Sequence, residues 1–273
     1  MKYALFNGLR REAEHGLKGE CQFDGHLMVP RCGDIRRPHW AHQVGHSCDP
    51  WWENEGEWHR SWKGHFPVDW QEVIHRAENG DKHIADVKTD QGWVFEFQHS
   101  FLNPEERQSR DAFYQKLIWI VDGTRRKKDL SQFSNAWEAG IPVNGKPFVR
   151  RIHANDCAIL REWADTTAPV FIDFRPQLNL VWLLPKDFDG TRQYVAIFPR
   201  TELIAMHRGG VTQQVDDFAA FLKEFSQLIS DYNAHLRAQL PAQPVPRPQY
   251  RQSYPTPSFN QFSARLARSR RRF

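Results

Sequence analysis

Two carboxylates and one amide stand inside apolar segments of residues 83–100, which read HIADVKTDQGWVFEFQHS. Asp86 lies in the first apolar segment, and Glu96 and Gln98 lie in the second. The turn TDQG between the two segments predicts a β-hairpin. Residues i and i+2 of a strand share a face, and neighbouring strands lie about 4.8 Å apart. Glu96 and Gln98 are therefore expected to point the same way, with Asp86 within reach of the same patch.

Such a pair of carboxylates would do metal chemistry. Two carboxylates that converge on one point repel each other unless a cation or a proton lies between them. Oxygen ligands favour Mg²⁺ or Mn²⁺, and an ion held there can activate water and neutralise charge at a phosphodiester. The alternative interpretation is the solvent face of a half-exposed hairpin. It explains the flanks IADV and WVFEF less well, because their composition is typical of buried strands.

A second set of polar residues recurs at helical spacing. The segment PWWENEGEWHRSWKGHF, which follows a proline-marked boundary at Pro50, predicts a helix. Glu55, His59 and Lys63 lie four residues apart and form one stripe on it, whereas Glu57 faces elsewhere. The alternative is a row of ion pairs on a solvated helix face, each worth about 0.2–0.5 kcal/mol.

Cysteine and histidine gather in the first 50 residues. Thiolates and imidazoles at short spacing suit a closed tetrahedral zinc site, and crowded cysteines in a reducing compartment indicate metal before disulfide. The predicted zinc ligands are Cys21, Cys32, His39, His42 and Cys48. The alternative is a set of buried thiols, with histidines that contact DNA or the core. Cys157 stands alone and is expected to be an inert core residue.

Length, composition and charge limit the class of protein. The chain has 273 residues, and seven of its 11 tryptophans precede residue 94, which argues against disorder in the N-terminal half. No apolar segment approaches the roughly 18 residues of a membrane helix, and the N-terminus does not resemble a secretory signal. We therefore expect a soluble, cytoplasmic protein without a membrane partner. The net charge of +4 includes seven arginines and no acidic residue after residue 240, which leaves −3 for residues 1–240.

The remaining elements follow from local patterns. Apolar segments predict strands over QEVIHRA, KLIWIVDG, FVRRI, PVFIDF, LNLVWLL and QYVAIF. Helices are expected over NPEERQSRDAFYQ, with Asn103 as its cap, over CAILREWA and RTELIAMH, and over the amphipathic segment that ends near Leu240. The predicted organisation is a Cys/His-rich module (1–50), a core (51–155), an accessory α+β region (156–240) and a disordered Pro/Arg-rich tail (241–273).

The segment from Cys32 to Gly123 resembles the competence CoiA-like family, a branch of the PD-(D/E)XK nuclease superfamily. The matching pieces, in order, are PHWAH (38–42), ENEGEWHRSWK (53–63), HIADV (83–87), EFQHS (96–100), ERQSRDAFY (106–114) and IWIVDG (118–123). The resemblance implies an α/β fold with a restriction-endonuclease-like core, a mixed sheet flanked by helices. It also implies a zinc-ribbon-like module before that core and an α+β region after it.

The resemblance also implies roles for the hairpin and the helical stripe. Asp86 and Glu96 would bind Mg²⁺ or Mn²⁺. Gln98 stands where the superfamily most often has lysine, and it would orient the attacking water by hydrogen bonding without lending positive charge. The pattern E-x-x-x-H-x-x-x-K falls on Glu55, His59 and Lys63, so Glu55 would complete the metal site and Lys63 would supply the charge. Glu57 is the second choice for the helical carboxylate.

Two further sets of residues follow from the same resemblance. Arg107, Arg110 and Tyr114 would contact DNA phosphates or support the metal carboxylates, and ordinary surface and core roles are the alternative. The zinc-ribbon module usually opens with C-x-x-C, but this chain reads CQFD, with Asp24 in the second position. Asp24 as an oxygen ligand, Cys48 as a substitute and loss of the site all remain open.

The expected function is a metal-dependent nuclease that acts on DNA, with single strands or recombination intermediates as candidate substrates. The resemblance links it to DNA uptake and recombination or to defence against foreign DNA. One alternative is a nucleic-acid-binding protein that keeps the fold without cleaving. Another is a structural zinc protein whose C-terminal region binds a protein partner. The oligomeric state stays open, and the resemblance makes a homodimer possible because many nucleases of this fold cut as dimers. The basic tail is expected to contact phosphates or only to solubilise the chain.

Overall fold

A computed structural model describes residues 1–34, 37–43, 46–53, 55–175, 179–208 and 217–240. Met1–His235 form one compact unit, and the described residues 236–240 belong to a second. The tail predicted over residues 241–273 lies outside the described residues. No described helix has the length and apolar composition needed to cross a membrane.

The first 50 residues form a small antiparallel sheet with its own core. Its five strands, in the spatial order β2-β1-β3-β4-β5, are β1 (Tyr3–Phe6), β2 (Leu9–Glu12), β3 (Gly19–Glu20), β4 (Leu27–Arg31) and β5 (His39–His42). Trp40 and Met28 are fully buried in it. A Cβ on Gly19 would lie 2.9 Å from the Ala4 Cβ and 3.1 Å from the Trp40 ring. Glycine is required there because the strand passes directly over the tryptophan.

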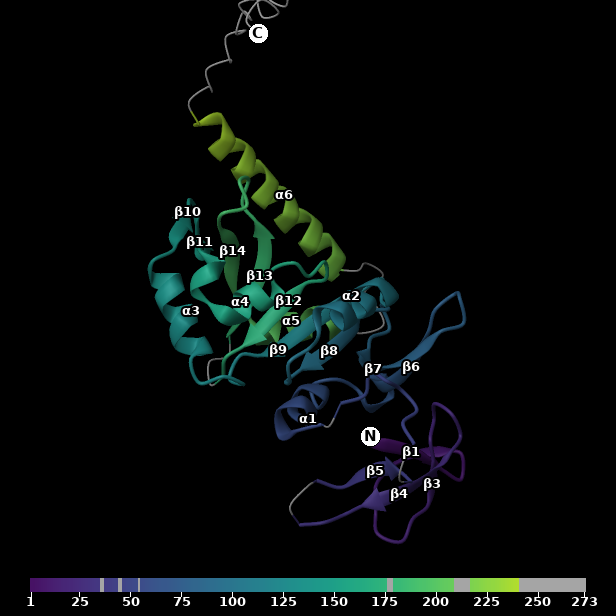
Figure 1. The fold of residues 1–273 in the computed structure, drawn as a ribbon. Coiled ribbons are helices and arrows are strands. Elements are labelled where there is room, and N and C mark those ends of the chain that lie inside the picture. The colour runs from purple at the N-terminus through teal and green to yellow at the C-terminus, as the bar shows by residue number, and fades with distance from the viewer. Residues whose placement is uncertain (35–36, 44–45, 54, 176–178, 209–216, 241–273) are drawn as a thin grey trace, which may run out of the picture. The chain divides into compact units, whose positions relative to one another are not determined.

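A nine-stranded sheet forms the rest of the fold, in the order β10-β11-β14-β13-β12-β9-β8-β7-β6 (Figure 1). Its strands are β6 (Gln71–Arg76), β7 (Lys82–Lys88), β8 (Val94–Gln98), β9 (Leu117–Asp122), β10 (Ile141–Val143), β11 (Lys146–Ile152), β12 (Val170–Asp173), β13 (Asn179–Lys186) and β14 (Gln193–Pro199). β9 pairs in parallel with both β8 and β12, and the other pairs are antiparallel. The expected mixed α/β class, with a mixed sheet flanked by helices, is therefore confirmed.

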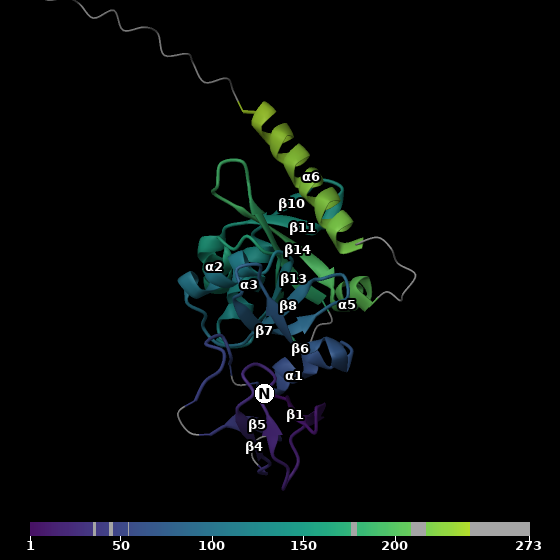
Figure 2. The ribbon, with the colours of Figure 1, turned by 90° about the vertical axis from the view of Figure 1, so that its right-hand side faces the viewer.

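Helices cover both faces of this sheet (Figure 2). They are α1 (Glu57–Lys63), α2 (Pro104–Phe113), α3 (Asp129–Glu138), α4 (Ala158–Trp163), α5 (Arg200–Arg208) and α6 (Asp217–Ala238). The strand β9 shows why both faces need cover, since Ile118 and Ile120 pack into one core cluster while Trp119 packs into the other. A parallel strand in the middle of a sheet is buried on both sides.

The region expected to be separate after residue 155 continues the same sheet. The register pairs Asp173 of β12 with Asp122 of β9, and Phe171 with Ile120. All four residues of β12 are buried. β12 lies between β13 and β9 inside the sheet. The boundary expected near residue 156 therefore does not divide the sheet. The helix α3, between β9 and β10, was not expected from the sequence.

The helix expected from Pro50 onward begins only at Glu57. Gly56 occupies the N-cap position with an extended backbone and offers no side chain to cap the helix. Glu55 therefore lies in the loop before the helix, and the expectation that it shares a helical stripe with His59 and Lys63 is wrong. From that loop its side chain still forms an ion pair with Lys63.

Candidate active site and metal cluster

The β7–β8 hairpin holds Asp86 at the point where its two strands separate. The ladder pairs Val87 with Phe95 and Lys88 with Val94. One step further, the Asp86 Oδ2 accepts the backbone N–H of Phe97 at 3.0 Å. The carboxylate thus takes the place of a backbone carbonyl as acceptor, and this hydrogen bond fixes the side chain between the strands.

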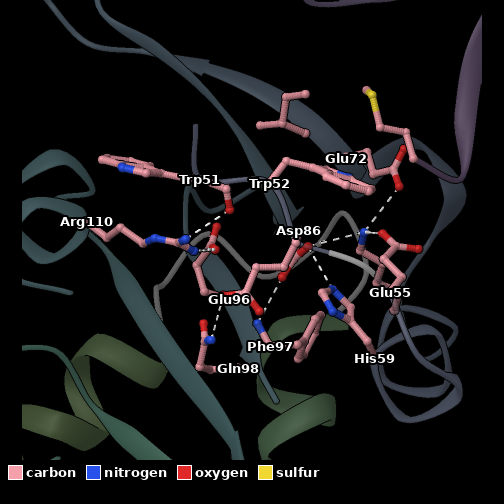
Figure 3. A pocket seen from close by; sticks show the side chains of 14 residues that line it. Trp51, Trp52, Glu55, His59, Glu72, Asp86, Glu96, Phe97, Gln98 and Arg110 are labelled. Atoms are coloured by element: carbon pink, nitrogen blue, oxygen red, sulfur yellow. Dashed lines mark hydrogen bonds and ion pairs between the residues drawn. The ribbon is translucent and has the colours of Figure 1, made fainter. Parts of the chain in front are cut away.

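Three carboxylates of the pocket, those of Asp86, Glu55 and Glu72 (Figure 3), surround one buried ammonium group. Lys63, which is 1% exposed, places Nζ 3.2 Å from Asp86 Oδ1 and 3.3 Å from Glu72 Oε1, and it forms an ion pair with Glu55. Burial alone would lower the pKa of Lys63, but the charges of these carboxylates raise it well above its ordinary value. Lys63 is therefore a permanent cation in the site.

Asp86 and Glu96 have pKa values shifted in opposite directions. Burial would raise the pKa of Asp86, but His59, whose Nε2 lies 2.8 Å from Asp86 Oδ1, and Lys63 lower it below its usual range. Burial and the charge of Asp86 raise the pKa of Glu96 to about 8, against the opposing effect of Arg110. Glu96 Oε2 accepts from Arg110 Nη1 at 3.1 Å. Its Oε1 is buried and has no hydrogen-bond partner within the described part of the chain.

These side chains line one pocket. Its cavity of about 30 Å³ exceeds the roughly 10–15 Å³ that a single water needs. The predicted residues that line it are Asp86, Glu96, Gln98, Glu55, His59, Lys63 and Arg110. Ligand atoms of Glu55, His59 and Asp86 lie within 4.8 Å of one another and could hold a metal ion. Glu57, the second choice, lies elsewhere and pairs with Arg37 with its side chain 83% exposed.

Arg107 and Tyr114 do not line this pocket. Arg107 is 4% exposed, hydrogen-bonds the backbone carbonyl of Glu162 and stacks over Trp163. Tyr114 is 2% exposed and packs into the core. Both environments match the core role given as the alternative, and the contact of these two residues with DNA stays a prediction. Arg110, which is also buried, supports Glu96 instead of facing solvent.

Two carboxylates that the sequence analysis did not single out also line the pocket. Glu72, at φ +48°, is buried and accepts the backbone N–H groups of Lys2 at 2.7 Å and Tyr3 at 3.0 Å. Glu53 accepts a hydrogen bond from the Gln98 amide. Their sequence context reads as an ordinary strand start and an ordinary loop. Only their positions beside Lys63 and Gln98 give them a role.

A second group of ligand atoms lies in the N-terminal sheet. Cys21, Asp24, His42 and Cys48 bring their ligand atoms within 4.8 Å of one another and could hold a metal ion. The two sulfur atoms lie 3.7 Å apart, and the backbone N–H of Phe23 points to Cys21 Sγ at 3.4 Å. The pairing of β4 with β5 and the turn after β3 produce this proximity. The cluster shares Asp24 with a more exposed group that includes His26 and His46.

Cys32 and His39, two of the five predicted ligands, are not part of this cluster. Cys32 is half-buried and packs against the core of the N-terminal sheet, and His39 Nδ1 lies 3.0 Å from the backbone oxygen of Arg37. Asp24 and Cys48 both lie in this cluster, so each of them could complete the ligand set in place of the second cysteine of a C-x-x-C pair. The prediction failed for Cys32 and His39 because spacing along the chain does not show which residues β4 and β5 bring to the same end.

The electrostatics of the cluster suit a cation. The hydrogen bond with Cys48 lowers the pKa of Cys21 to about 6, against the opposing effect of burial. The same hydrogen bond raises the pKa of Cys48. His42 has a side chain only 10% exposed, and its Nε2 is buried without a hydrogen-bond partner among the described residues. A thiolate and an imidazole nitrogen without a hydrogen-bond partner can both act as metal ligands.

The chain matches no protein-family model, and neither a curated protein nor a solved structure is significantly similar to it.

Proposed function

We propose that this protein is a metal-dependent nuclease that hydrolyses DNA phosphodiester bonds with Mg²⁺ or Mn²⁺, on a core of the PD-(D/E)XK type. The observation that carries the proposal is the buried, unpartnered Oε1 of Glu96 close to the Asp86 carboxylate. A buried polar atom without a partner is costly, and the repulsion between neighbouring carboxylates is relieved by a proton or by a cation. A divalent ion satisfies both requirements.

The residues present fit such an ion. Asp86 and Glu96 would hold it. Glu55, from the segment before α1, and His59, from α1 itself, would be additional ligands, because their ligand atoms lie within 4.8 Å of that of Asp86. The bound ion would lower the pKa of a water ligand and neutralise charge on the phosphate. Lys63, whose ammonium is held by three carboxylates, would stabilise the negative charge that develops on the phosphate.

Gln98 and Arg110 have supporting roles in this proposal. Gln98 orients the attacking water by hydrogen bonding. Arg110 Nη1 and Nη2 bond to Glu96 and to the backbone oxygen of Trp51, at 3.1 and 2.9 Å. Arg110 therefore holds one metal ligand in place, and DNA phosphates must be bound by other groups. The candidate substrates are single strands or recombination intermediates. The candidate processes are DNA uptake and recombination, or defence against foreign DNA.

We propose further that Zn²⁺ binds Cys21, Asp24, His42 and Cys48 in a structural site. Four protein ligands close a tetrahedral zinc site and leave no open position for catalysis. The buried, unpartnered His42 Nε2 and the low pKa of Cys21 support this assignment. Asp24 would replace the second cysteine of the C-x-x-C pair.

One observation favours a second function, a nucleic-acid-binding protein that does not cleave. Lys63 already neutralises part of the charge of Glu55, Glu72 and Asp86 without any metal ion. A site whose carboxylates are paired in this way is stable with no divalent ion. The unpartnered Glu96 oxygen is not explained by that arrangement, and we therefore prefer the nuclease.

The test is cleavage of single- and double-stranded DNA with Mg²⁺ or Mn²⁺ by the wild-type protein, Asp86→Ala and Glu96→Ala. Glu57→Ala is the matched control, because this exposed glutamate lies on the same segment outside the pocket. We expect metal-dependent cleavage that both site variants lose and the control keeps. Cleavage that persists in the site variants would indicate a contaminant. DNA binding without cleavage by any form would favour the second function.

A further inference from the structure

The Gln98 amide is buried in the pocket wall, and every group around its nitrogen is a hydrogen-bond acceptor. Its Nε2 donates to Glu53 Oε1 at 2.8 Å and lies 3.2 Å from the backbone oxygen and 3.1 Å from the Oγ of Ser100. The Ser100 hydroxyl in turn donates to Glu53 Oε2 at 2.6 Å. The Ser100 hydroxyl therefore donates its proton to Glu53, and the lone pairs of its oxygen can accept a hydrogen bond from Gln98 Nε2.

We infer that Glu53 is a positioning residue that holds the Gln98 amide in one orientation and presents its carbonyl oxygen to the pocket. A carboxylate only accepts hydrogen bonds. Rotating the amide by half a turn would place Gln98 Oε1 against the negative Glu53 oxygen and lose the bonds to both Glu53 and Ser100. The nitrogen therefore faces Glu53, and the oxygen takes the opposite end of the amide, to which no described residue donates.

The orientation decides what Gln98 can do, and this step rests on the proposed nuclease function. A fixed carbonyl oxygen accepts an O–H of the attacking water and leaves a water lone pair free to face the phosphorus. A freely rotating amide would donate to the water half of the time and occupy that lone pair. Neither Gln98 nor Glu53 forms or breaks a covalent bond or takes a proton in this scheme. The two residues only set the direction of the water.

Hydrogen bonds hold the residues that precede Glu53. Asp49, which is 2% exposed, accepts the backbone N–H groups of Ile84 at 2.7 Å and of Trp51 at 3.0 Å. The backbone oxygen of Trp51 accepts from Arg110 at 2.9 Å. Glu53, two residues after Trp51, is therefore attached to both β7 and α2. A positioning residue needs such support to hold its partner in the productive geometry.

The first test is a double-mutant cycle in DNA cleavage with Mn²⁺, using wild type, Glu53→Ala, Gln98→Ala and the double variant, with Glu57→Ala as the control. We expect Glu53→Ala to lower kcat about ten- to hundred-fold, with KM and the half-saturating Mn²⁺ concentration changed less than about two-fold. The double variant should be no slower than Gln98→Ala, because Glu53 acts only through Gln98. Glu53→Gln, which keeps one acceptor oxygen, should recover part of the rate.

Several results would overturn the inference while leaving the nuclease intact. Unchanged kcat in Glu53→Ala would remove any role for Glu53. Multiplied losses in the double variant, or a large rise in the Mn²⁺ requirement, would make Glu53 an independent metal ligand. If the wild-type protein does not cleave DNA, the proposed nuclease function itself is refuted. That outcome is distinct from the three results above, which concern Glu53 alone.

A spectroscopic readout tests the orientation separately from catalysis. In protein labelled with ¹⁵N-glutamine, the side-chain NH₂ signal absent from Gln98→Ala belongs to Gln98. We expect this NH₂ group to exchange slowly with solvent in wild type and in Glu57→Ala, and to exchange at least about ten times faster in Glu53→Ala. Equal exchange in wild type and Glu53→Ala would show that Glu53 does not hold the amide and would overturn the inference.

Discussion

Replacing Glu96 by glutamine in the metal-free protein should remove a pH dependence of stability. The pKa of Glu96 is about 8 in the folded protein, raised by burial and by Asp86, against an ordinary value of 4.5. Between these two values the folded protein binds one proton more than the unfolded chain. The free energy of unfolding therefore falls as the pH rises through this window. Glu96→Gln is neutral at every pH and lacks this contribution.

The magnitude follows from the width of the window. The interval from 4.5 to about 8 spans 3.5 pH units, and each unit is worth about 1.4 kcal/mol. The loss is thus at most about 5 kcal/mol, and water that enters the pocket once Glu96 ionises would reduce it. Burial lowers the pKa values of His65 and His75, so these histidines make stability rise with pH near neutrality. Their contribution is common to wild type and variant and cancels in the difference.

The assay is urea unfolding followed by tryptophan fluorescence from pH 5 to pH 9 in the presence of EDTA. We expect wild type and Glu96→Gln to have similar stability at pH 5, where both side chains are neutral, and the variant to be more stable at pH 9. The low pKa values of Asp86 and Glu55 keep both groups ionised throughout this range, so they add no slope. Parallel curves for the two proteins would refute the argument that burial and Asp86 keep Glu96 protonated near neutral pH.

Three further predictions concern other buried groups. Asp173→Ala should cost about 2–5 kcal/mol in urea unfolding, because it leaves the buried Nε1 groups of Trp58 and Trp62, both bonded to Asp173 Oδ2 at 2.9 Å, without an acceptor. His42→Ala should lower the zinc content measured by elemental analysis from one equivalent towards zero and reduce Tm, whereas a variant that keeps its full equivalent would exclude His42 as a ligand. Arg107→Ala should destabilise the fold by about 1–3 kcal/mol without changing the salt dependence of DNA binding, and a smaller salt slope would support its predicted phosphate contact.

The sequence predicted those parts of the fold that depend on neighbouring residues. The β7–β8 hairpin follows from two apolar segments that flank the turn TDQG, in which Gly92 has a φ of +83°. The parallel pairing of β12 with β9 could not be predicted in this way. It joins residues about 50 positions apart, and the apolar pattern of VFID identifies a buried strand without naming its neighbour.

The same limit applies within the candidate site. Asp86, Glu96 and Gln98 were identifiable because each interrupts an apolar strand, where a polar residue needs an explanation. Glu53 and Glu72 lie in segments where a glutamate is unremarkable, and only the folded chain brings them to Gln98 and Lys63.

The site depends on the whole sheet, and the hairpin is only one of its supports. Asp173 on β12, more than a hundred residues away in sequence, accepts hydrogen bonds from both tryptophans of α1 and thereby sets the position of that helix. The same helix carries His59 and Lys63 to Asp86. On the other side, Glu72 contacts Lys63 and accepts the backbone N–H groups of Lys2 and of Tyr3, the first residue of β1. Because each support is a buried charged group that bridges two segments, losing one end leaves the other unpaired. We therefore expect the pocket to need both the small sheet and β12.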